Sequence, residues 1–153
     1  GESPAHALRV VLTRGATEFV GTATFAALSQ QDPVTDTYDA RFPLGAHIEL
    51  ADKLDLLVIA PATARVLASC AHGLGDDLLT TLYLNCDCPV LMAPAMSDAM
   101  WRQPAVQRNV SQLVEDGVHF IGPESGWLSC RKEGKGRMSE PEDLLAAIDA
   151  KLN

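Results

Sequence analysis

Apolar residues gather in short runs along the chain, and longer amphipathic segments separate these runs. Runs that are rich in β-branched residues, or apolar at nearly every position, predict strands at residues 8–13, 55–60, 88–93 and 118–121. Amphipathic segments predict helices at residues 17–28, 66–71, 77–84 and 104–116. The last of these helices has Pro104 in its first turn and Gly117 as its stop. Strands that alternate with helices predict an α/β fold built on a parallel sheet.

A further helix is predicted at the end of the chain. Ser139 and Glu142 have the spacing of a capping box, with Pro141 inside the first turn. Two other stretches, residues 32–45 and 122–137, are rich in proline or glycine and predict irregular loops.

The ends of the predicted strands are informative, because ligands bind beyond the carboxyl ends of parallel strands. The first three strands lead into residues 13–16, 61–65 and 94–97. Two of these exits begin with Pro-Ala, followed by a polar or flexible residue, which suits tight loops that let a flat ligand approach the backbone. Ordinary strand–helix turns use the same residue types, and the pattern alone slightly favours them.

Composition limits the classes of function. The chain has 153 residues, a length that suits one domain with a sizeable core. Its net charge of −8 argues against a nucleic-acid surface, and no apolar run approaches the roughly 18 residues of a membrane span. Four cysteines in a core-forming chain of this size favour a reducing cytoplasm over a disulfide framework. Cys86 and Cys88 lack a second pair at zinc spacing, so no metal site is predicted.

Signatures of common nucleotide and hydrolase sites are missing from the sequence. No G-x-G-x-x-G follows a predicted strand, and no G-x-S-x-G elbow occurs. Residues 134–137 lack the length and the terminal hydroxyl residue of a P-loop.

Four segments share their order and spacing with one known family over nearly the whole chain. The first joins His47-Ile-Glu-Leu to Pro61-Ala-Thr-Ala, and the second is Gly73-x-x-Asp-Asp-Leu-Leu-Thr-Thr. The third, Pro94-Ala-Met-Ser-Asp-Ala-Met-Trp, is similar to a P-A-M-N-x-x-M-W motif, and the fourth, residues 122–141, resembles a substrate-clamp segment with a catalytic Cys. Together they resemble the flavin-dependent cysteine decarboxylases, and above all the phosphopantothenoylcysteine decarboxylases.

This resemblance implies a flavodoxin-like or Rossmann-like three-layer α/β sandwich, with residues 1–153 as a single flavoprotein domain. It also implies a homo-oligomer, a trimer or a dodecamer built from trimers, with FMN bound between subunits. Small residues and backbone amides at the strand ends suit a flat, anionic cofactor. The residues expected around FMN are Thr13, Thr63, Ala64, Arg65, Val66 and Ala95.

The family's reaction has two halves. FMN first oxidises the cysteine end of the substrate to a thioaldehyde, which loses CO2. In the coenzyme A enzymes, a Cys then helps to return the enethiol to the saturated thiol. The resemblance assigns His47 to the first half as a base and Cys130 to the second half. His47 precedes a predicted helix at residues 48–54, whose positive end disfavours imidazolium; without the family context, a capping or surface histidine is the simpler interpretation.

Positive charge gathers around Cys130 in an otherwise acidic chain. Four of the chain's twelve basic residues lie between positions 131 and 137, and such charge stabilises a thiolate and holds a phosphate or carboxylate. A solvated basic loop beside an inert thiol is the alternative. The residues expected to bind a small thiol substrate that bears phosphate and carboxylate are Ser97, Met100, Leu128, Ser129, Arg131 and Lys135.

The chain departs from the family pattern at the predicted site and at its start. Arg65 and Ser97 stand where the family has Asn, and Arg131 stands where it usually has Gly. Ser97 offers one hydroxyl in place of an amide, and Arg65 or Arg131 could recognise the substrate carboxylate instead. The equal alternative is a pocket that takes another thiol substrate or has lost activity. The chain also begins at what resembles the family's second strand. It therefore lacks the first strand–helix unit, and we expect that unit upstream of the given sequence.

These features predict a cytoplasmic FMN-dependent carboxy-lyase that converts phosphopantothenoylcysteine to phosphopantetheine in coenzyme A synthesis. One alternative is a decarboxylase of another cysteine-bearing substrate, such as a peptidyl cysteine. Another is a flavin-binding regulatory protein without turnover. The resemblance also allows a fused or separate phosphopantothenate-cysteine ligase as partner, whereas no nucleic-acid or membrane partner is expected.

Overall fold

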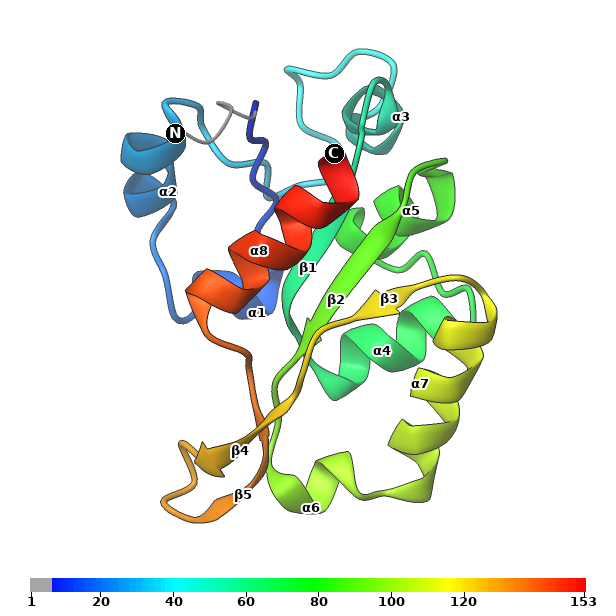
Figure 1. Ribbon diagram of the computed structural model, residues 1–153. Helices are drawn as coiled ribbons and strands as arrows, with labels where there is room; N and C mark the ends of the chain where they lie inside the picture. Colours follow the sequence, from blue (N-terminus) through cyan, green and yellow to red (C-terminus); the bar gives the residue numbers. More distant parts are fainter. Residues whose placement is uncertain (1–6) are drawn as a thin grey trace. The chain divides into compact units, whose positions relative to one another are not determined.

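The structure is a computed structural model that describes residues 7–153, and the chain forms two compact units. The larger unit contains residues 53–74 and 86–153, and the smaller unit contains residues 7–52 and 75–85. Figure 1 labels the helices and strands of both units. The strands of both described sheets belong to the larger unit.

Three parallel strands form the main sheet of the larger unit, in the order β1-β2-β3. They are β1 (Leu57–Ala62), β2 (Val90–Pro94) and β3 (His119–Phe120). All five residues of the central strand β2 are buried, as expected of a parallel strand between two neighbours. Ala62 pairs with Pro94, so the carboxyl ends of β1 and β2 lie side by side. The strands predicted at 55–60, 88–93 and 118–121 are confirmed with shifted bounds.

The helices of the larger unit are α4 (Ala64–Ala71), α6 (Asp98–Trp101), α7 (Pro104–Glu115) and α8 (Pro141–Leu152). Figure 1 shows α8 across one face of the sheet, whereas α4 and α7, which pack against each other, lie on the other face. Leu67 of α4, Met92 of β2 and Leu113 of α7 are fully buried and belong to the core. Pro104 begins α7, and Gly117 follows its end with a φ of 92°, a conformation that glycine adopts without strain.

The glycine-rich stretch that we predicted to be irregular contains a β-hairpin instead. Strand β4 (Glu124–Trp127) pairs antiparallel with β5 (Glu133–Arg137). The buried hydroxyl of Ser139 donates a hydrogen bond of 3.1 Å to the Glu124 carboxylate, which closes the base of this hairpin. The predicted capping box is therefore wrong: Glu140 is the N-cap of α8, and its side chain makes no capping hydrogen bond.

The smaller unit contains four helices, α1 (Arg14–Thr17), α2 (Thr22–Ser29), α3 (Ala46–Ala51) and α5 (Leu78–Asn85). The predicted strand at residues 8–13 appears only as a parallel bridge between Val11 and Val34. The predicted helix at residues 17–28 is divided, because Gly21 adopts an extended conformation as the N-cap of α2. Helix α3 packs against α5. Within residues 7–153, none of the helices combines the length and apolar character needed to cross a bilayer.

Candidate functional site

The carboxyl edge of the β1–β2 pair carries most of the residues predicted to bind the cofactor. The amide of Ala95 donates a 3.1 Å hydrogen bond to the carbonyl of Ala62, which holds the loops after β1 and β2 against each other. Thr63 is the N-cap of α4, and its hydroxyl accepts from the Val66 amide at 3.4 Å. Ser97 has the same role in α6, where its hydroxyl accepts from the Met100 amide at 3.4 Å. Each hydroxyl keeps its own hydrogen to donate to a ligand.

The loop after β1 presents polar groups outward and an apolar group inward. Thr63 and Arg65 are exposed, and Ala64 is half-buried. Val66 is buried, so its side chain belongs to the core, and its amide is already bound by Thr63. Among these predicted residues, Thr63 and Arg65 are therefore the ones with exposed side chains, and Ala64 is partly exposed.

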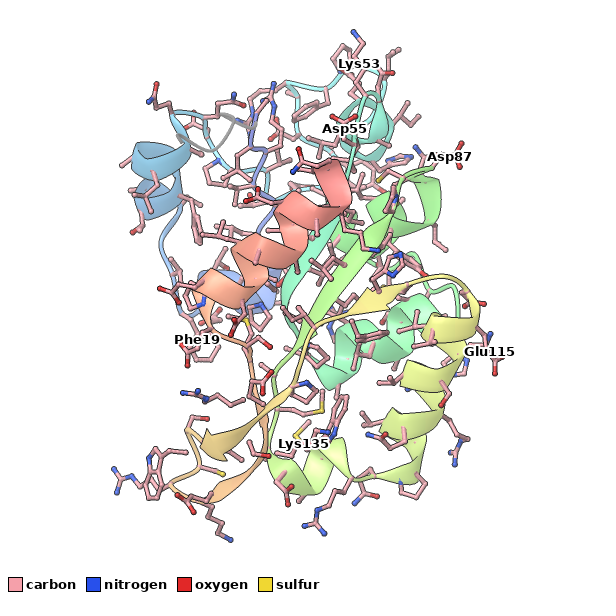
Figure 2. All side chains as sticks on the ribbon, in the orientation of Figure 1. Phe19, Lys53, Asp55, Asp87, Glu115 and Lys135 are labelled. Atoms are coloured by element: carbon pink, nitrogen blue, oxygen red, sulfur yellow. The ribbon has the colours of Figure 1, made fainter. Side chains whose placement is uncertain are left out.

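The hairpin is joined to the loop after β2 by its second strand. The Met96 amide donates to the carbonyl of Gly136 at 2.9 Å, and β5 contacts α6. Figure 2 labels Lys135 at this junction, beside α6. The structure thus brings Ser97 and Met100 together with the strand that carries Lys135.

Cys130 occupies the tip of the hairpin. The turn is closed by hydrogen bonds of 2.9 Å from the Leu128 amide to the Lys132 carbonyl and from the Arg131 amide to the Leu128 carbonyl. Leu128 is buried and anchors the turn, whereas Ser129, Cys130 and Arg131 are exposed. Arg131 has a φ of 61°, the left-handed conformation that favours glycine. This observation gives a physical reason why glycine would suit position 131.

The other two predicted residues, Thr13 and His47, belong to the smaller unit. Thr13 is the N-cap of α1, and its hydroxyl accepts from the Ala16 amide at 3.2 Å. His47 lies in the first turn of α3, which begins one residue earlier than His47 and not after it as predicted. Its carbonyl accepts a 3.3 Å hydrogen bond from the Asn85 side chain.

The ring of His47 contains an unsatisfied polar atom. Its Nδ1 is buried, and residues 7–153 supply no hydrogen-bond partner to it. Buried polar atoms without partners are rare in folded proteins. The unsatisfied Nδ1 is therefore an exception in this structure that concerns the histidine predicted to act as a base.

Sequence reasoning missed three residues at the junction between the hairpin and α6, namely Asp98, Gly134 and Gly136. A signal was present: two glycines two positions apart in a strand lie on the same face, and glycine in a strand often marks the close approach of another backbone. We did not predict a strand there, so this signal was not used.

Cys86 and Cys88 lie just before β2, and the pKa of Cys88 is shifted. Burial and the neighbouring Cys86 raise the pKa of Cys88 to about 11, which keeps the thiol protonated near neutral pH. Within the described range there is also no cluster of three or more His, Cys, Asp or Glu side chains that suits a metal ion.

The fold and these segments define a flavoprotein: the chain belongs to the family described as Flavoprotein, whose model matches residues 3–153. It is 45% identical over 139 residues to the coenzyme A biosynthesis bifunctional protein CoaBC of Bacillus subtilis. That similarity covers 90% of the chain and 34% of the relative, so the chain spans about a third of the length of the curated relatives it matches.

Two solved structures are similar over nearly the whole chain. The FMN-dependent cysteine decarboxylase SpaF is 40% identical, with a TM-score of 0.82 over 94% of this chain and 77% of that one. A cysteine-to-serine mutant of a PPC decarboxylase, complexed with pantothenoylaminoethenethiol, is 32% identical, with a TM-score of 0.82 over 94% of this chain and 82% of that one. The predicted family and the predicted α/β, flavodoxin-like fold are confirmed.

Proposed function

We propose that this chain is an FMN-dependent decarboxylase that converts phosphopantothenoylcysteine to phosphopantetheine in coenzyme A synthesis. The observation that carries this proposal is the junction of the Cys130 hairpin with the loop of Ser97, at the carboxyl edge of the sheet. Similarity to CoaBC proteins and to a PPC decarboxylase supports the choice of substrate.

The residues at the strand ends fit a flavin. Thr63 and Arg65 are exposed, and a hydroxyl and a cation suit an anionic group, while the small side chains of Ala64 and Ala95 suit the close approach of a flat ring. When bound, FMN would supply the oxidising chemistry for the cysteine end of the substrate.

The remaining roles fall to side chains of the chain. We assign to His47 the removal of a proton from the substrate, and to Cys130 the later donation of a proton to the enethiol. Lys135 and Arg131 are exposed cations that suit the phosphate or carboxylate of the substrate, and Ser97 offers its hydroxyl. We assign apolar contact with the substrate to exposed Met100 and polar contact to exposed Ser129. Leu128 is buried, so it would act mainly by anchoring the turn that carries Ser129.

A second substrate class is favoured by one observation. Of the two solved structures, the cysteine decarboxylase SpaF is more similar to this chain, at 40% identity, than the PPC decarboxylase, at 32%, although CoaBC of Bacillus subtilis reaches 45%. Ser97 and Arg65 also replace the family's Asn residues. A peptidyl cysteine is therefore the alternative substrate, and its decarboxylation would not need Cys130.

We further propose that the chain acts as one flavoprotein domain of a cytoplasmic homo-oligomer whose basic unit is a trimer. Large apolar side chains with high exposure support this assembly, since a second copy would cover them. Phe19 and Tyr38 of the smaller unit are 90% and 92% exposed, and Figure 2 labels Phe19. A phosphopantothenate-cysteine ligase, fused or separate, is the proposed partner, since the similar CoaBC proteins are named as bifunctional.

The test combines a visible spectrum with a product assay. The purified protein is expected to bind FMN, to release CO2 from phosphopantothenoylcysteine and to yield the saturated thiol. A peptide that ends in cysteine serves as the competing substrate. A protein that binds FMN but releases CO2 from neither substrate would contradict the proposal and favour a regulatory role. A preference for the peptide, with an unsaturated product, would select the alternative substrate.

A further inference from the structure

The second strand of the hairpin approaches the loop after β2 more closely than side chains allow. A Cβ atom added to Gly134 would lie 2.6 Å from the Cβ of Asp98, and one added to Gly136 would overlap the carbonyl oxygen of Met96. Gly134 and Gly136 are two positions apart in β5, so both lie on the same face of the strand, the face toward this loop. The two glycines therefore let the hairpin dock against the residues that flank Ser97.

The carboxylate of Asp98 connects the two segments. Its Oδ1 accepts from the backbone amide of Lys135 at 3.2 Å. Its Oδ2 accepts from Nε of Arg102 at 2.8 Å and forms an ion pair with the same guanidinium. Arg102 is the C-cap of α6, four residues after Asp98, so this ion pair holds Oδ2 while Oδ1 bonds to the hairpin. One side chain thus bonds both to the helix after Ser97 and to the strand after Cys130.

We propose that Asp98 is a positioning residue that fixes the hairpin, and with it Cys130, against the loop of Ser97. The inference rests on the proposed function, because it gives the hairpin a catalytic purpose. The contact acts through backbone atoms of β5, so it holds the strand whichever side chains the hairpin carries. A purely local role for Asp98 is the competing explanation, because an acidic residue in the first turn of a helix also stabilises that helix.

Amide hydrogen exchange in residues 133–137 separates the two explanations and needs no catalysis. Asp98→Ala is expected to accelerate exchange there about tenfold, since a hydrogen bond to a charged group is lost. Asp98→Asn keeps an acceptor for the Lys135 amide and should exchange more slowly than the Ala variant. Gly134→Ala leaves Asp98 intact but forces its Cβ against the aspartate, so it should accelerate exchange as well.

Two matched controls keep the measurement specific. Asp116→Ala removes an exposed carboxylate that accepts from Gln112 at the end of α7, away from the hairpin. Gly21→Ala adds a methyl group where no atom lies within 4 Å. Neither change should alter exchange in residues 133–137. The proposal would be overturned if the amides of residues 133–137 exchange at the wild-type rate in both Asp98→Ala and Gly134→Ala.

A product assay then tests the catalytic purpose. Under single-turnover conditions, Asp98→Ala is expected to raise the ratio of unsaturated to saturated product severalfold, because Cys130 no longer has a fixed position. An unchanged ratio beside accelerated exchange would overturn the positioning role. Failure of the wild-type protein to release CO2 would refute the proposed function, while the exchange experiment would still decide whether Asp98 holds the hairpin.

Discussion

The two residues assigned to acid–base chemistry have opposite surroundings. His47 lies in the first turn of a helix that packs against another helix, and its Nδ1 is buried. Cys130 is exposed at the tip of a two-stranded hairpin, and a two-stranded hairpin on its own is marginally stable. The histidine is thus held by packing, whereas the cysteine depends on the contacts that its hairpin makes.

This difference agrees with the roles proposed for the two residues. A base that starts the reaction benefits from a fixed position, because misplacement by a fraction of an ångström slows proton transfer. Cys130, as a proton donor on a hairpin, acts only in the second half of the reaction. Its loss would therefore leave the first half, the release of CO2, unaffected. The two halves of the proposed reaction should therefore respond differently to substitution.

The largest effect is expected from His47→Asn. Asparagine fills a similar space but cannot take up the proton, so CO2 release should fall about 10³-fold. The initial rate of CO2 release from the cysteine-bearing substrate is the measurement. His72→Asn is the matched control, because His72 is exposed at the end of α4. If His47→Asn releases CO2 as fast as the control, His47 is not the base.

A smaller and qualitatively different effect is expected from Cys130→Ser. Serine keeps the size of the side chain, but its hydroxyl is a much poorer proton donor than a thiol. CO2 should still be released. The ratio of the unsaturated enethiol to the saturated thiol among the products should rise about 10²-fold. Mass spectrometry of the product measures this change, with Cys86→Ser as the control. Unchanged yield of the saturated thiol would make Cys130 a structural thiol.

Much of the larger unit could be predicted because its signals are local. The continuous apolar run of β2 predicts a buried strand, and the proline and glycine that flank α7 predict its ends. The Pro-Ala exits of β1 and β2 predicted the neighbouring loops that now carry Thr63 and Ser97. In each case the sequence pattern and the tertiary surroundings favour the same structure.

The hairpin could not be predicted in this way, because its stability comes from residues that are distant in sequence. Glycines at positions 134 and 136 weaken a strand by local propensity, yet they permit the approach to Met96 and Asp98. The segment at residues 8–13 shows the opposite case. It has the composition of a strand, but it forms only a bridge to Val34 in the described structure.

An effect that does not touch the proposed reaction is expected in the rates at which two thiols are alkylated. Cys130 is exposed, whereas burial and Cys86 raise the pKa of Cys88 to about 11. A raised pKa leaves less thiolate at neutral pH, so Cys88 should react about 10²-fold more slowly than an ordinary cysteine. Its rate should increase as the pH rises toward its pKa, because the thiolate fraction increases. Iodoacetamide labelling followed by peptide mass spectrometry measures both rates, and labelling in urea, where both sites are open, is the control. Equal rates for Cys88 and Cys130 in the folded protein at neutral pH would contradict the expected difference between exposed Cys130 and half-buried Cys88.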